Sequence, residues 1–147
     1  LKDKELRKND SLKKYEIKIE EIDIDIYVEH YSKLAVPVEE IKNYADNIEG
    51  FKVVNSEMLV LLKQDAFEDR KNSIKGEKDK IDIVSLVFFS DFNLKEYENI
   101  AKKYKIEKFI YELKNVISGF NDYNSLSLKP QELKRMKAKF MLEWRKR

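Results

Sequence analysis

The stretch from Ser56 to Leu86 constrains the fold most, because its apolar side chains recur at the spacing of two consecutive helices. These apolar positions are Met58, Leu59, Leu61, Leu62, Ala66, Phe67, Ile81, Ile83, Val84 and Leu86. Serine often caps a helix N-terminus, and glycine often ends a helix. The sequence therefore predicts a helix that Ser56 caps and Gly76 stops, followed by a second helix that begins near Glu77.

Charged side chains follow the same helical spacing on both predicted helices. Lys63, Ala66 and Arg70 share one face of the first helix, and Asp79 and Asp82 share one face of the second. One interpretation is a network of ion pairs that fixes how the two helices dock. The other is an anionic ligand, such as a nucleotide phosphate, that faces one or more of four candidate cations in this region. Those cations are Lys63, Arg70, Lys75 and Lys78.

The N-terminal part shows the two-residue alternation of strands, with a change of parity at Glu20 and Glu21. A hairpin turn at these two residues explains the change, and so does a bulge in one long strand. In both cases Asp23 and Asp25 share a face opposite the isoleucines. Paired carboxylates of this kind hold divalent metal ions in phosphoryl-transfer enzymes. They are also typical of a solvent-exposed strand face, where charged side chains discourage pairing with another strand.

The remaining pattern completes an α+β prediction: a small mixed or antiparallel sheet followed by a bundle of four to five helices. Pro37 precedes a helix predicted over 38–48, which Gly50 ends, and a strand is predicted over 51–54. Further helices are predicted over 93–104, over 106–118 and from Pro130. We expect residues 1–55 and 56–147 to form two parts of one compact unit.

The composition excludes several classes of site. The chain of 147 residues has no cysteine, three glycines and one histidine, His30, which we expect at the surface. Disulfides, thiolate metal sites, multi-histidine sites and a glycine-rich phosphate loop are therefore excluded. No apolar run approaches the roughly 20 residues that span a membrane, so we expect a soluble, cytoplasmic chain without membrane partners.

Charge is distributed unevenly along the chain. Residues 16–50 contain ten acids and three lysines, whereas residues 129–147 contain eight bases and two acids. The basic tail is typical of a solvated helix face and also of a segment that contacts nucleic acid. A helical interaction domain whose tail binds RNA is therefore one functional hypothesis.

A resemblance adds a second hypothesis. The segments LLKQDAFEDR and KGEKDKIDIVSL resemble the region after the catalytic sheet in nucleotidyltransferase-fold proteins of the AbiEii toxin type, which are minimal relatives of the DNA polymerase β superfamily. The segment YEIKIEEIDIDIYV resembles the strand pair that carries that family's third metal-binding carboxylate, with Asp25 the best match and Asp23 the other candidate. The segments VPVEEI and FKVVNSEML are also similar. The matching positions in the central stretch are Lys63, Ala66, Arg70, Lys75, Gly76, Lys78, Asp79 and Asp82.

The resemblance implies Mg²⁺-dependent transfer of a nucleotidyl group from an NTP to a hydroxyl on RNA or protein, within a toxin–antitoxin pair. Asp25 and Asp23 would be the catalytic and metal-binding carboxylates. Lys63, Arg70, Lys75 and Lys78 would face the nucleotide, and Asp79 and Asp82 would orient these cations.

The chain departs from the family pattern in one respect. The family places a glycine turn before an Asp-x-Asp pair, and no glycine precedes Asp23-Ile24-Asp25. If Asp25 is the third carboxylate, the first two are expected before Leu1. The alternative is a catalytically inactive relative that binds a nucleotide or a partner protein, such as an antitoxin.

Overall fold

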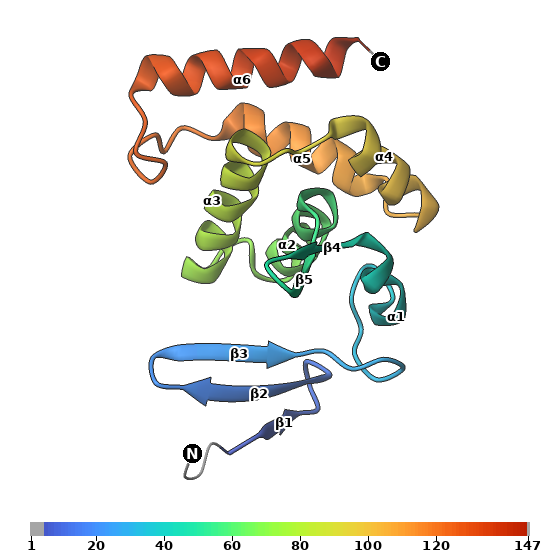
Figure 1. Cartoon of the computed structure of the whole chain (residues 1–147). Helices are drawn as coiled ribbons and strands as arrows, with labels where there is room; N and C mark the ends of the chain where they lie inside the picture. The colour runs from blue at the N-terminus through green and yellow to red at the C-terminus, as the bar shows by residue number, and fades with distance from the viewer. Residues whose placement is uncertain (1–4, 147) are drawn as a thin grey trace.

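The computed structural model describes residues 5–146 and has the α+β architecture that the sequence predicts. Figure 1 shows a three-stranded sheet at the bottom, a separate two-stranded hairpin in the middle in front of a helix, and the other long helices stacked above the sheet. The strands are β1 (Arg7–Asn9), β2 (Lys14–Ile19), β3 (Ile22–Ile26), β4 (Ala45–Ile48) and β5 (Phe51–Val54). The helices are α1 (Val38–Ile41), a 3-10 turn η1 (Lys42–Tyr44), α2 (Ser56–Arg70), α3 (Ile74–Phe89), α4 (Leu94–Lys103), α5 (Lys108–Gly119) and α6 (Pro130–Arg145).

The change of parity in the N-terminal part is a hairpin turn and not a bulge. Strands β2 and β3 pair antiparallel, with Ile19 opposite Ile22, so Glu20 and Glu21 form the two-residue turn. Glu20 has a φ of +56°, as the tight hairpin turns require. Strand β1 pairs with the other edge of β2. The isoleucines therefore line one face of the sheet, and Asp23 and Asp25 lie on the opposite face.

The predicted helix over 38–48 is correct only in its first part. It ends at Ile41, continues as the 3-10 turn, and is followed by β4, which pairs with β5. Glu49 and Gly50 both have positive φ, +51° and +86°, and connect Ile48 to Phe51 as a two-residue hairpin turn. Gly50 is therefore a hairpin residue and not a helix stop. The strand predicted over 51–54 is confirmed as β5.

The two central helices are confirmed, but the structure changes how they begin and end. The α2 cap is Asn55, whose side chain accepts a hydrogen bond from the Met58 N–H, and Ser56 is the first helical residue. Gly76 lies inside α3, in the first turn, and Ser73 is the cap of that helix. A Cβ atom on Gly76 would lie 2.1 Å from the carbonyl oxygen of Arg70. Glycine is thus needed because the end of α2 touches the start of α3.

The core is built by the helices α2 to α6, with α6 lying alongside α5 as the outermost layer in Figure 1. Gln64 and Tyr97 are fully buried and bond to each other and to the carbonyl of Phe109, so α2, α4 and α5 share a polar contact within an apolar core. The apolar stripe of α6 buries Leu133 and Phe140. Among residues 5–146, no helix is both long and apolar enough to cross a membrane.

Candidate functional site

A polar cleft of about 570 Å³ separates the N-terminal sheet from the junction of α2 and α3. We call it the sheet–helix cleft. Four of the residues predicted to carry function line it: Asp23 and Asp25 from β3, Arg70 from the end of α2, and Lys75 from the start of α3. The other lining residues are Glu5, Arg7, Lys14, Glu16, Ile17 and Lys18. The fold therefore brings together carboxylates and cations that lie more than 40 positions apart in the sequence.

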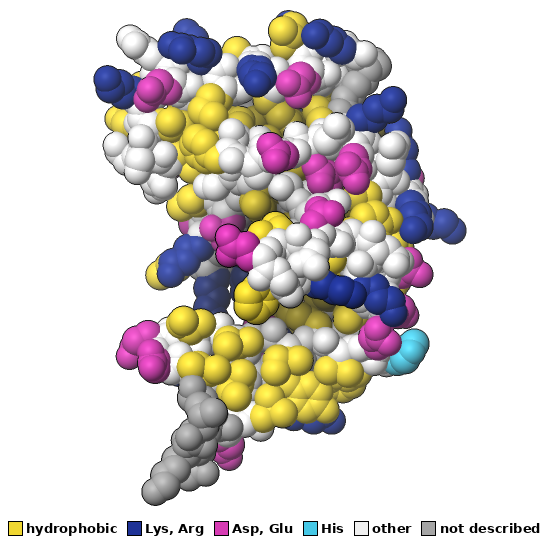
Figure 2. All heavy atoms as spheres, viewed as in Figure 1, with side chains coloured by type: hydrophobic (Ala, Val, Ile, Leu, Met, Phe, Trp, Pro, Cys, Tyr) yellow, Lys and Arg dark blue, Asp and Glu magenta, His cyan; other side chains and the backbone are white. Residues whose placement is uncertain are grey.

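The sheet turns its polar face toward this cleft. The strand register places Asp25 opposite Glu16 and Asp23 opposite Lys18. The isoleucine face points the other way, and Figure 2 shows it as a broad hydrophobic patch over β2 and β3. Ile22 is 63% exposed on this face. The charge of the cleft therefore depends on which face of the sheet points toward the helices.

Lys14 holds the sheet carboxylates on the cleft side. Its ammonium lies 2.8 Å from Asp25 Oδ2 and 3.0 Å from Glu16 Oε1. Partial burial disfavours the charged form of Lys14, but the hydrogen bonds to Asp25 and Glu16 outweigh this effect and raise the pKa of its side chain. The same ammonium lowers the pKa of Glu16, with a further contribution from the amide of Asn9.

The carboxylates of the cleft fall short of a magnesium site. Mg²⁺ prefers several oxygen ligands in octahedral geometry. Within residues 5–146, no group of three or more histidine, aspartate or glutamate side chains is arranged to hold a metal ion. Asp25 already has a cation, Lys14, within hydrogen-bond distance. The described residues do not form a complete magnesium site by themselves.

Arg70 is fixed in the wall of the cleft by Asp79. The guanidinium donates two hydrogen bonds to this carboxylate, Nε to Oδ2 at 2.6 Å and Nη2 to Oδ1 at 3.0 Å. Asp79 is only 2% exposed, whereas the Arg70 side chain is 40% exposed. The hydrogen bonds to Asp79 raise the pKa of Arg70. Asp79 thus orients the cation, and the predicted ion pairing between the two helices is present.

The ion-pair network continues away from the cleft. Lys63 Nζ lies 2.6 Å from Asp82 Oδ2 and 3.8 Å from Asp79 Oδ1. Lys63 and Asp82 line a separate hollow with Leu59, Ser85, Leu86, Phe89 and Ser90. Lys78 is exposed and lines neither space. These three residues are therefore not brought to the cleft, whereas Lys75 lines it and has no ion-pair partner within 4.0 Å in the described part of the chain.

A second hollow of about 710 Å³ adjoins the cleft and shares Lys14, Asp25 and Arg70 with it. Its walls come from the β2–β3 hairpin, α1, β5 and α2. Most of the apolar lining is contributed by Leu12, Tyr27, Leu34, Val38, Ile41, Val54, Leu62 and Ala66. Partial burial raises the pKa of the Tyr27 hydroxyl. The two spaces together offer a charged end and a more apolar end.

Six other lining residues were not predicted from the sequence. A signal for three of them was present, because Lys14, Glu16 and Lys18 have the parity of the polar face of β2. His30 lies at the surface as expected, with an 82% exposed side chain 3.8 Å from Glu39.

Compared with known proteins, the chain matches no family model, and it has no significant match among curated proteins or solved structures.

Proposed function

We propose that this chain is a nucleotidyltransferase-like module that binds the phosphate groups of an NTP in the sheet–helix cleft. The observation that carries the proposal is the position of Arg70. Its guanidinium is held by the buried Asp79 and still reaches the cleft, where Lys75 has no ion-pair partner among the described residues. A preoriented guanidinium next to a free ammonium is well suited to phosphate oxygens, because arginine donates two parallel hydrogen bonds and lysine adds a point charge.

The adjoining hollow supports the same proposal. It shares three residues with the cleft and has apolar walls from α1, β5 and α2. Small-molecule sites commonly combine an apolar wall with a few placed polar groups. A nucleotide with its phosphates at Arg70 and Lys75 would have room for its ribose and base on this side.

Nucleotidyl transfer is the second candidate function. It is favoured by Asp23 and Asp25, which lie in the same cleft as the proposed phosphate-binding cations. The hydroxyl acceptor would be RNA or protein, as the resemblance implies. Because the described residues do not complete a magnesium site, phosphate binding is the function that the geometry supports best, and no step is derived through the metal.

The test is NTP binding by isothermal titration calorimetry, with and without Mg²⁺. Lys75→Gln removes one cation from the cleft and should weaken binding by about tenfold, as the loss of one charge-assisted hydrogen bond does. Lys78→Gln is the matched control, since Lys78 is an exposed cation on the same helix outside the cleft. Equal effects of the two variants, or no NTP binding at all, would refute the proposal.

Asp25→Asn separates the two candidate functions. If the cleft only binds phosphates, this variant removes a negative charge and releases Lys14, so metal-free NTP affinity should rise. If the protein transfers nucleotides, the variant should abolish labelling of RNA or protein by a radioactive NTP. Full labelling by Asp25→Asn would exclude Asp25 from transfer chemistry.

A further inference from the structure

The outer face of α6 carries cations that the cleft does not use. Five exposed basic residues lie on this face and extend along about 18 Å of helix at the usual rise per residue. They are Lys134, Arg135, Lys139, Arg145 and Lys146. None of them has a carboxylate within 4.0 Å in the part of the chain that the structure describes. The positive charge of this face is therefore not neutralised by ion pairs within residues 5–146.

The position of α6 explains why its basic side is exposed. Leu133 and Phe140 are buried against the other helices, and the Phe140 and Trp144 rings lie 5.9 Å apart. The apolar stripe is thus used for packing on the domain. A helix that lies in a membrane surface must turn its apolar side outward. On its outward side α6 presents five cations and a single large apolar side chain that is more than half exposed, Leu142 at 55%, so a soluble polyanion fits this face better than a lipid surface.

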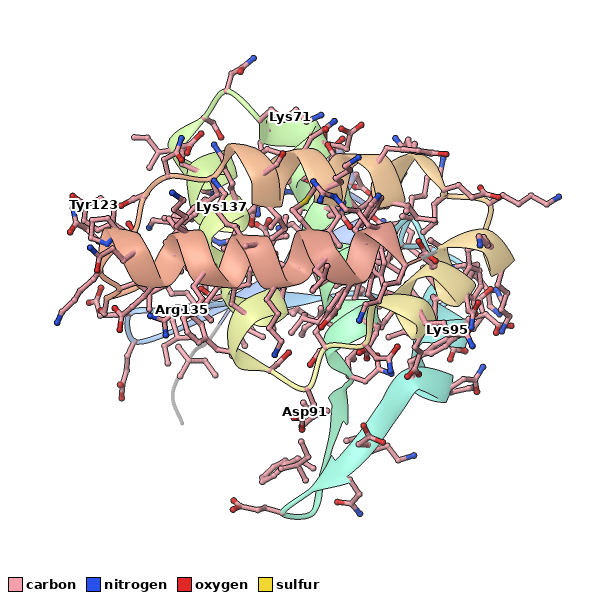
Figure 3. The ribbon with its side chains drawn as sticks, turned by 90° about the horizontal axis from the view of Figure 1, so that it is seen from above. Lys71, Asp91, Lys95, Tyr123, Arg135 and Lys137 are labelled. Carbon is pink, nitrogen blue, oxygen red and sulfur yellow. The ribbon has the colours of Figure 1, made fainter. Side chains whose placement is uncertain are left out.

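A hollow of about 390 Å³ lies at the N-terminal end of α6. It is lined by Asn121, Tyr123, Pro130, Leu133, Lys134 and Lys137. Lys137 donates a hydrogen bond to the Phe120 carbonyl at 2.8 Å, which fixes the loop before the helix. Figure 3 shows Tyr123 at this end of α6, with Arg135 and Lys137 on the two sides of the helix. The half-buried tyrosine ring and the exposed cation Lys134 therefore line one space.

We propose that α6 is a binding surface for single-stranded nucleic acid. Its outer cations contact successive phosphates, and one unpaired base enters the hollow and stacks on Tyr123. Basic grooves combined with aromatic side chains bind single strands in this way, because every base has a stacking face. This site is separate from the sheet–helix cleft, and it does not depend on whether the cleft binds an NTP.

The first experiment measures the fluorescence anisotropy of a labelled 15-nucleotide oligo(U) with the full chain, between about 50 and about 200 mM salt. If each of the five outer cations contacts one phosphate, the slope of log K against log salt is about −3.5, which is about a 130-fold loss of affinity over this range. The triple variant Lys134→Gln/Arg135→Gln/Lys139→Gln should reduce the slope by about 2. The control triple variant Lys95→Gln/Lys102→Gln/Lys105→Gln removes three exposed cations from α4 and the turn after it, and should leave the slope unchanged. Equal effects of both triple variants would overturn the proposal.

The second experiment tests the base site. Tyr123→Ala should weaken oligo(U) binding by about tenfold without changing the salt slope, whereas Tyr123→Phe should retain affinity because it keeps the stacking face. Oligo(dT) in place of oligo(U) shows whether the strand is RNA or DNA. Unchanged affinity in Tyr123→Ala, equal binding of a duplex, or preferential binding to vesicles of anionic phospholipid would each refute a single-strand site. Lys75→Gln should bind the oligonucleotide normally, which separates this site from the NTP cleft.

Discussion

Replacing Gly76 by alanine should destabilise the protein, although alanine is the better helix former. Gly76 lies in the first turn of α3, and a Cβ atom there would lie 2.1 Å from the Arg70 carbonyl oxygen and 2.8 Å from its carbon. Ordinary carbon contacts begin at about 3.5 Å, so the end of α2 and the start of α3 must separate. The Arg70 carbonyl cannot move freely, because the N–H and the hydroxyl of Ser73 both donate to it, at 3.0 and 2.8 Å.

The size of the effect follows from two opposing terms. Overpacking against backbone costs about 3 kcal/mol, the upper end of the usual range, since no flexible side chain can yield. The higher helix propensity of alanine relative to glycine offsets about 1 kcal/mol of this cost. The net loss of about 2 kcal/mol corresponds to a fall in Tm of about 4 to 8 °C for a chain of this size.

The assay is thermal and urea unfolding followed by circular dichroism, with Gly119→Ala as the matched control. Gly119 is the last residue of α5, and an added Cβ there meets nothing within 4 Å. The control should therefore be neutral or stabilise the fold by up to about 1 kcal/mol. If Gly76→Ala is as stable as the parent chain, the start of α3 does not contact the Arg70 carbonyl as closely as described above.

Three further predictions concern single contacts. Ser73→Ala removes the α3 cap that accepts the Gly76 N–H and should cost about 1 kcal/mol in urea unfolding, whereas a helix beginning at Glu77 would be unaffected. Tyr97→Phe leaves the buried side-chain carbonyl oxygen of Gln64 without its hydrogen-bond donor and should cost about 1 to 3 kcal/mol in urea unfolding. An unchanged unfolding midpoint would contradict the buried network. Burial raises the pKa of Asp65 above its unfolded value of 3.8, so its ionisation opposes folding as pH rises through this range. The Ala35 N–H donates a hydrogen bond to Asp65 at 2.7 Å, and Asp65→Asn keeps an acceptor for it. This variant should stabilise the protein near about pH 7 but not below about pH 3. Equal changes in the free energy of unfolding at both pH values would show that the ionisation of Asp65 has no role.

The contact between α2 and α3 could be predicted from sequence because its information is local. Lys63 and Arg70 are seven residues apart on one helix, and Asp79 and Asp82 are three apart on the next, so each pair lies on one face of its own helix. The short turn between the helices and the opposite charges of the two faces then favour their pairing, which the structure shows. The ends of the helices could not be predicted in the same way. The tertiary approach of two backbones determines the role of Gly76, and a residue type that often stops helices is found here inside one.

The segment over 38–48 shows a competition between two local signals. Ile41, Tyr44, Ala45 and Ile48 have the spacing of a helical stripe, which favours a helix up to Gly50. Glu49 and Gly50 instead form a tight hairpin turn between Ile48 and Phe51, and the strand pairing of 45–48 with 51–54 replaces the last turns of the helix. The two-residue turn, which needs positive φ at both positions, was the overlooked signal.

The sheet–helix cleft depends on information that the alternation of β2 and β3 does not contain. A period of two assigns residues to two faces, but it does not say which face packs on the rest of the chain. A hydrophobic-inside rule would turn the isoleucines toward the helices and place Asp23 and Asp25 on the outside. The structure has the opposite arrangement, so that the carboxylates share the cleft with Arg70 and Lys75 and the Ile22 side chain faces solvent in the described chain. The choice of face therefore brings two separate charge patterns into one cleft, and it is set by the three-dimensional placement of the sheet relative to the α2–α3 junction.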